Sequence, residues 1–323
     1  MRGAQVFRNY RFVRDRVLEM QAVASGGRPS VYWQEELSGF EYMLDASPLI
    51  IDKLRHHTYH VTGLRVYDYR TRRDRARDRM VKKLEALVVA GKPELLVPES
   101  PLLGGFGFKV DDHLYNLDTL KFFEVLIALD RGAILSEFQG GERRLVWEIG
   151  AGWGGFPYQF KTLYPNTTYV ITDLPELFLF SATYLMALFP DARVGFWDEE
   201  SSAGLSANWR EYDFIFIPNT AVSDFTPDRL DLAINMVSFQ EMTDVQVAGY
   251  VERAHALNCP FFYSLNRDRS AYNPEISNVS DILSRYYWPR DLQILPVSYQ
   301  KMLDEPPSPH DYKHNIGWRR VKT

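Results

Sequence analysis

From residue 144 to residue 266 the sequence alternates between short apolar runs and amphipathic helical patterns. The apolar runs are RLVWEIGAG, TTYVITDLP, YDFIFIPN, LDLAINMVSF and CPFFYSLN. Repeated strand–helix units of this length predict a parallel sheet with right-handed crossovers and helices on both faces. Ligands of such sheets bind beyond the carboxyl ends of the strands. We therefore expect the functional residues at those ends.

The pattern divides the chain into three parts. Residues 1–92 are helical in pattern and show no strand–helix alternation, residues 93–143 form a connecting loop and helix, and residues 144–323 carry the sheet. The prediction is an α/β, Rossmann-like domain with a mainly helical N-terminal region. That helical region is a candidate for substrate binding or for dimerisation, so a homo-oligomer is among the expected states.

Composition excludes several classes of function. The 323 residues carry a net charge of -5, so no overall positive field recruits nucleic acid. Cys259 is the single cysteine, which rules out an internal disulfide and a cysteine-based zinc site. No uncharged run reaches the roughly 18 residues of a membrane span, and the first residues lack the apolar core of a signal peptide. We expect a cytoplasmic protein.

A glycine-rich turn follows the first apolar run. The segment VWEIGAGWGGF holds Gly150, Gly152 and Gly155 in GxGxxG spacing, which is typical of a dinucleotide site. Glu148, two residues before the first glycine, would repel a pyrophosphate but suits a cationic ligand. S-Adenosylmethionine carries a sulfonium and an ammonium, so the turn favours this cofactor. Asp173 ends the second run and suits the ribose of either cofactor.

Four segments resemble a known family. VWEIGAGWGGF, TDLPE, DFIFIPN and especially DLAINMVSFQEM are similar to class I S-adenosylmethionine-dependent methyltransferases of the sugar O-methyltransferase group, over roughly residues 95–270. The resemblance implies a Rossmann-like fold, S-adenosylmethionine as cofactor, and a hydroxyl of a sugar or glycoconjugate as methyl acceptor.

The resemblance also implies roles for individual residues. Those expected to cradle the methionine part of the cofactor are Glu148, Gly150, Ala151, Gly152 and Trp153. Asp173 and Leu174 are expected at the ribose and adenine, and Asn219 at the adenine, with Asp198 as a second candidate there. The segment from Ser238 to Met242 is expected to face the transferring methyl group.

The chemistry of the acceptor calls for a proton acceptor. A sugar hydroxyl is a weak nucleophile at neutral pH, so a general base or a divalent ion is expected beside it. Glu241 is the first candidate base, Gln240 a hydroxyl-binding neighbour and His113 an alternative base. Gln240 and Glu241 are also consistent with a cap for the helix that begins near Thr243.

Further acceptor contacts are expected from side chains near these segments. Asn266, Arg267 and Asp268 follow the fifth apolar run and could bind acceptor hydroxyls or a phosphate. Trp153 and Tyr158 could stack on a sugar. His56 and His60 have a metal-pair spacing but lack the glutamate of an HExxH motif, so no metal site is predicted.

Two other functions use the same features. A nicotinamide-dependent oxidoreductase would use the glycine turn, although Tyr158 is followed four residues later by Thr162 rather than by the lysine of a Tyr-x-x-x-Lys pair. A non-catalytic protein with the methyltransferase fold would keep the turn for binding alone. Both alternatives stay open at the level of sequence.

Overall fold

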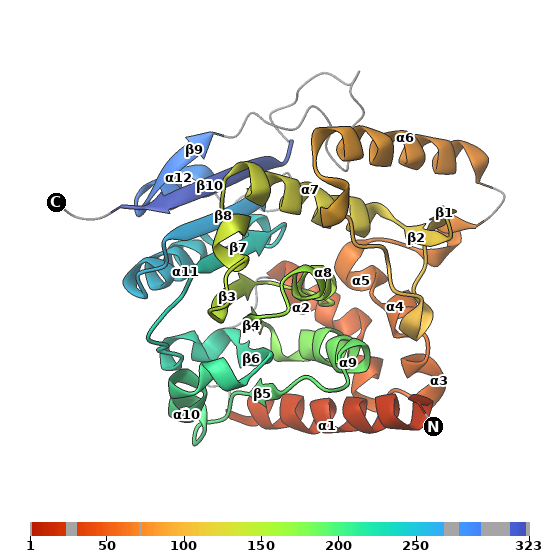
Figure 1. Ribbon diagram of the computed structural model, residues 1–323. Coiled ribbons are helices and arrows are strands. Elements are labelled where there is room, and N and C mark those ends of the chain that lie inside the picture. Colours follow the sequence, from red (N-terminus) through yellow and green to blue (C-terminus); the bar gives the residue numbers. More distant parts are fainter. Residues whose placement is uncertain (1, 24–30, 71–72, 268–277, 292–310, 321–323) are drawn as a thin grey trace.

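The computed structural model describes residues 2–23, 31–70, 73–267, 278–291 and 311–320. An eight-stranded sheet forms its centre, with the strand order β5-β6-β4-β3-β7-β8-β10-β9 (Figure 1). The strands of this sheet are β3 (Arg144–Ile149), β4 (Thr167–Asp173), β5 (Val194–Phe196), β6 (Phe214–Pro218), β7 (Leu232–Met236), β8 (Phe261–Asn266), β9 (Tyr287–Asp291) and β10 (Lys313–Arg319). Strands β3 to β8 are parallel to one another, and β10 runs antiparallel between β8 and β9. The predicted Rossmann-like class is confirmed.

Helices cover the sheet and build the N-terminal region. In chain order they are α1 (Arg2–Val23), α2 (Val31–Gly39), α3 (Pro48–Ile51), α4 (Leu54–His57), α5 (Tyr59–Thr62), α6 (Asp74–Ala90), α7 (Leu117–Arg131), α8 (Gly155–Leu163), α9 (Phe178–Leu188), α10 (Ser202–Ala207), α11 (Asp244–Ala256) and α12 (Val279–Ser284). None of these described helices combines the length and the apolar character that a bilayer span requires.

Alternation along β3 shows why both faces of the sheet need cover. Successive strand residues point to opposite faces. The Trp147 ring packs near Tyr250 of α11, with ring centroids 6.1 Å apart. Its neighbour Glu148 points to the other face, where it meets Tyr169 beneath α8. Every residue of β3 from Leu145 onward is buried, as expected for a parallel strand covered on both sides.

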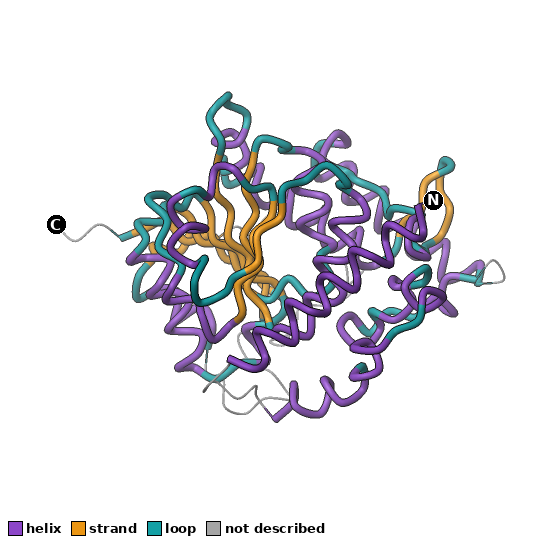
Figure 2. Tube along the Cα trace, turned by 90° about the horizontal axis from the view of Figure 1, so that it is seen from below, coloured by secondary structure: helices purple, strands orange, loops and turns teal. Residues whose placement is uncertain are grey.

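The N-terminal region is helical, as predicted, and packs on the sheet domain. Helix α1 buries a stripe at helical spacing against α9, and this stripe is Val6, Tyr10, Val13, Val17 and Met20. Helix α6 ends before Gly91 and packs on α7. Figure 2 shows these helices gathered beside the strands rather than continuing the sheet.

Short strands escaped the sequence prediction. The hairpin of β1 (Phe108–Val110) and β2 (His113–Tyr115) lies within the predicted connecting loop, and β5 adds an edge strand. Each of these strands has three residues, too few for an alternating pattern to stand out. Because β6 rather than β5 pairs with β4, the segment after β5 lies away from the centre of the sheet.

Candidate active site

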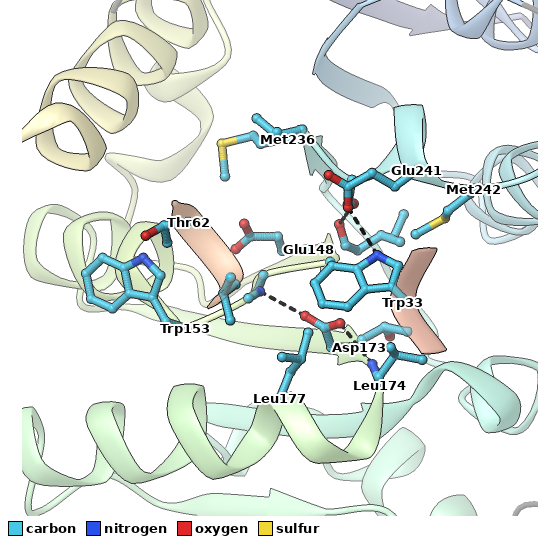
Figure 3. A pocket seen from close by; sticks show the side chains of 18 of the residues that line it. Trp33, Thr62, Glu148, Trp153, Asp173, Leu174, Leu177, Met236, Glu241 and Met242 are labelled. Carbon is cyan, nitrogen blue, oxygen red and sulfur yellow. Dashed lines mark hydrogen bonds between the residues drawn. The ribbon is translucent and has the colours of Figure 1, made fainter. Parts of the chain in front are cut away.

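A cavity of about 260 Å³ opens at the carboxyl ends of β3, β4, β6 and β7 (Figure 3). Its walls combine the sheet domain with residues far away in sequence. The N-terminal region contributes Trp33, Val61, Thr62 and Leu64, and α7 contributes Leu117, Asp118, Lys121 and Phe122. The site is therefore enclosed by both parts of the chain.

The glycine turn forms the floor of this cavity. Gly150, Gly152 and Gly154 have φ angles of 74°, 58° and 85°, which lie in the left-handed region that glycine tolerates best. A Cβ at residue 150 would overlap the Ser238 side chain, and one at residue 152 would lie 2.8 Å from Cγ1 of Val61. The turn thus exposes bare backbone to the cavity while neighbouring side chains pack closely against it.

Asp173 joins the end of β4 to this turn. Its Oδ2 accepts a hydrogen bond from Gly152 N at 2.8 Å, and its Oδ1 accepts one from Leu174 N at 2.9 Å. Burial raises the pKa of Asp173 to about 7, although both backbone hydrogen bonds oppose the rise. The carboxyl group is held at the cavity wall with its orientation fixed by backbone (Figure 3).

Glu148 lies inside the cavity wall. The side chain is only 1% exposed, and Tyr169 Oη donates a hydrogen bond to its Oε2 at 2.8 Å. Burial raises the pKa of Glu148 to about 8, partly opposed by the Tyr169 hydrogen bond. Figure 3 shows Glu148 in the middle of the cavity, between Trp153 and Trp33. A cation placed there would be attracted by the ionised Glu148 carboxylate, whereas a phosphate would be repelled by it.

Glu241 forms the wall after β7, together with a residue of the N-terminal region. Trp33 Nε1 in α2 donates a hydrogen bond to Glu241 Oε2 at 3.1 Å (Figure 3). Glu241 as a residue is half-buried, and its carboxyl group lines the cavity. Removal of this carboxyl group from bulk water raises the pKa of Glu241 to about 8. A carboxyl group with such a pKa can exchange a proton near neutral pH.

A buried polar cluster fixes the backbone that carries Glu241. Asn235 Nδ2 donates to Ser238 Oγ at 2.6 Å, and Asn266 Nδ2 donates to Asn235 Oδ1 at 2.7 Å. Gln240 Oε1 accepts from the backbone N–H of Arg267 at 3.3 Å. Gln240 is buried in this cluster and does not line the cavity, so it has a structural contact rather than the predicted position at an acceptor.

The nine residues predicted to bind the cofactor all line the cavity. They are Glu148, Gly150, Ala151, Gly152, Trp153, Asp173, Leu174, Asn219 and Ser238. The structure brings Glu241 to the same cavity. Their contacts with a ligand stay a prediction.

Other candidates lie elsewhere. His113 is exposed on the β1–β2 hairpin, where its ring Nδ1 is 2.9 Å from the backbone oxygen of Asp111. This hairpin contributes no residue to the cavity lining, so the structure does not bring His113 to Glu241 and the other site candidates. Asp198 accepts hydrogen bonds from the backbone before α10, and Tyr158 packs between Tyr184 and Phe189. Asn266 belongs to the polar cluster, and Asp268 is outside the described residues.

The sequence analysis missed the contributions of α2 and α7. Asp118 and Lys121 have the i,i+3 spacing of a helical ion pair, a signal that was available but not used. Trp33 carries no local signal, because only the docking of α2 brings it to Glu241. The paired His56 and His60 fall in two separate short helices, and the described residues contain no group of three or more His, Cys, Asp or Glu placed to hold a metal ion.

Comparisons with known proteins give similar folds only. No family model and no curated protein sequence matches the chain. The N-methyltransferase NodS from Bradyrhizobium japonicum WM9, in complex with S-adenosyl-L-homocysteine, is 14% identical with a TM-score of 0.41, covering 66% of this chain and 94% of that one. Human N-acetylserotonin methyltransferase, in complex with S-adenosylmethionine, is 14% identical with a TM-score of 0.35, covering 64% of this chain and 55% of that one.

A candidate O-methyltransferase from Nostoc punctiforme is 10% identical with a TM-score of 0.36, covering 74% of this chain and 68% of that one.

Proposed function

We propose that the chain is an S-adenosylmethionine-dependent O-methyltransferase that acts on a hydroxyl of a sugar or glycoconjugate. One observation carries the proposal: a turn of left-handed glycines, hydrogen-bonded to Asp173, lies in the same cavity as the buried Glu148. The choice of a sugar hydroxyl rests on the resemblance of DLAINMVSFQEM to sugar O-methyltransferases.

The residues of the cavity fit an adenosyl cofactor with a cationic donor. Gly150 and Gly152 line the cavity with left-handed φ angles, so the turn presents backbone rather than side chains to a ligand. Asp173 offers carboxylate oxygens to ribose hydroxyls. Leu174 and Asn219 line the same cavity and would contact the adenine. When bound, S-adenosylmethionine supplies an activated methyl group on its sulfonium.

Two carboxyl groups would divide the remaining work. Glu148 in its ionised form offsets the positive charge of the donor, and the burial of Glu148 strengthens this attraction. Glu241 accepts the proton that the acceptor hydroxyl loses as its oxygen is methylated. Trp33 holds the Glu241 carboxylate through the indole N–H, so the base is oriented before the acceptor arrives.

The same geometry speaks against a nicotinamide dinucleotide. Its pyrophosphate would lie over the glycine turn, where Glu148 and Asp173 both present carboxyl groups. A phosphate there would raise the pKa of both groups further and would bind mainly to their neutral forms.

Two measurements test the proposal. Calorimetric titration with S-adenosylhomocysteine should give a saturable heat, and Asp173→Asn should weaken that binding by about 10- to 100-fold, the range for a hydrogen bond to a charged group. Incubation with methyl-labelled S-adenosylmethionine and glycan extracts of the host should then yield a labelled carbohydrate. Labelling of amines alone would redirect the proposal to N-methylation, and absence of cofactor binding would end it.

A further inference from the structure

Helix α7 places an ion pair on the cavity wall. Lys121 Nζ lies 3.2 Å from Asp118 Oδ1, one helical turn away, and both residues line the cavity. Their side chains are 16% and 4% exposed, so the pair is largely shielded from bulk solvent. Among the described residues that line the cavity, Lys121 is the one with a basic side chain.

Asp118 is held rigidly by a second, fully buried group of contacts. Its Oδ2 accepts hydrogen bonds from Arg55 Nη2 at 2.8 Å and from Trp153 Nε1 at 3.2 Å. The Arg55 guanidinium stacks on the Trp153 ring, 3.6 Å from its centroid, and its Nε donates to Glu99 at 2.8 Å. Lys121 is therefore anchored on a carboxylate that cannot readily turn away.

The Lys121 ammonium faces the acids of the cavity. Burial raises the pKa of both Glu148 and Glu241, and the positive charge of Lys121 opposes the rise at each of them. In Figure 3, Glu148 lies between two sides of the cavity: Trp153 and Thr62 lie on one side, and Leu174 lies on the other. Since Asp118 bonds to Trp153, the ion pair belongs to this end of the cavity, away from the expected adenosine end.

We propose that Lys121 binds the α-carboxylate of the cofactor's amino-acid end, with Asp118 as its positioning residue. The inference rests on the proposed function, because it assigns one end of that cofactor. The amino-acid end is a zwitterion and requires a cation and an anion side by side. Lys121 supplies the cation, and Glu148 faces the ammonium, whereas any carboxyl group of the cavity would repel the cofactor's carboxylate.

The affinities of three ligands distinguish the contact of Lys121 with the carboxylate from contacts with the rest of the cofactor. S-Adenosylhomocysteine has the complete amino-acid end, S-adenosyl-3-thiopropylamine keeps the amine but lacks the carboxylate, and 5′-methylthioadenosine lacks both. In the wild-type protein we expect the first to bind about 10- to 100-fold more tightly than the second, from one charge-assisted hydrogen bond. Lys121→Met should remove this preference and leave binding of the other two ligands nearly unchanged. Lys121→Arg keeps the charge and should retain most of the preference.

Each other outcome is decisive. Equal wild-type affinity for S-adenosylhomocysteine and S-adenosyl-3-thiopropylamine would overturn the assignment without any variant, even if Lys121→Met does not fold. Equal losses of all three ligands in a folded Lys121→Met would also overturn it, because the lysine would then act on the whole site. A wild-type protein that binds none of the three contradicts the proposed function instead.

Discussion

At residue 150 the backbone and the packing both require glycine. The φ angle of 74° disfavours any side chain, and a Cβ would overlap Ser238, which the Asn235 amide holds in place. The glycine therefore serves the shape of the turn itself, whether or not a ligand is bound.

Gly150→Ala should lower the free energy of unfolding by at least about 1–3 kcal/mol, the range for a strained left-handed residue. Gly249→Ala is the matched control, because Gly249 lies inside α11 with open space around its Cβ position. That substitution should stabilise the protein by about 0.5–1 kcal/mol. Urea unfolding measures both variants, and effects of the same sign would contradict the explanation.

The cavity residues at the strand ends were predictable from the sequence. The cavity residues that the N-terminal region contributes were not. Glu148, Asp173 and Asn219 each end or follow an apolar run, so local pattern alone placed them at one edge of the sheet. The sequence pattern also does not reveal that Gln240 contacts the polar cluster at Asn266. Trp33 was missed since its partner lies more than two hundred residues away.

At the scale of elements, Arg55 joins four segments. The guanidinium of this α4 residue pairs with Glu99 before the hairpin and with Asp118 of α7, and it stacks on Trp153 of the glycine turn. Arg55 is 0% exposed, and its partners Glu99 and Asp118 are buried, so both ion pairs are shielded from bulk solvent. Arg55 thereby joins the N-terminal region to the sheet domain at the Trp153 side of the cavity.

Arg55→Met should cost about 3–5 kcal/mol of stability, because buried Glu99 loses its ion-pair partner and buried Asp118 keeps only Lys121. Arg77→Ala, in α6, removes an arginine whose pair with Asp78 spans 3.9 Å between largely exposed side chains. This control should change stability by less than about 0.5 kcal/mol. Denaturant midpoints of the two variants give the comparison. An Arg55→Met protein as stable as the control would show that the network does not hold the segments together.

At the scale of the whole molecule, the carboxyl groups of the cavity bind protons near neutral pH. Burial raises the pKa of Asp173 to about 7 and that of Glu148 to about 8, so both groups are partly protonated at neutral pH in the empty protein. A cationic ligand favours their ionised forms and lowers both pKa values. Binding should therefore expel protons into solution.

Titration of the protein with S-adenosylmethionine near pH 7.5, in buffers of different ionisation enthalpy, should show the release of about 0.5–1 proton per site. Glu148→Gln should release fewer protons, and S-adenosylhomocysteine, which lacks the sulfonium, should also release fewer. Heats that do not depend on the buffer would contradict this description of the cavity.

The same groups make the stability of the empty protein depend on pH. A carboxyl group whose pKa is raised by folding binds more protons in the folded state than in the unfolded state. For Glu148, whose pKa rises from 4.5 to about 8, the contribution is fully present below about pH 4.5 and is lost as the pH rises through about 8.

Unfolding free energies measured from about pH 5 to about pH 8 should therefore fall less steeply in Glu148→Gln than in the wild type, by a difference of a few kcal/mol over that window. The amide cannot ionise, so the variant lacks this contribution at every pH. Parallel curves for the two proteins would contradict the raised pKa.

The contact of Val61 with the glycine turn links two parts of the chain in evolution. Since a Cβ at residue 152 would lie 2.8 Å from Val61 Cγ1, a larger residue at one position requires a smaller one at the other. A related chain without glycine at 152 should therefore carry alanine or glycine at 61. Replacing the turn alone with one that lacks glycine at 152 should therefore destabilise the protein unless residue 61 becomes smaller as well.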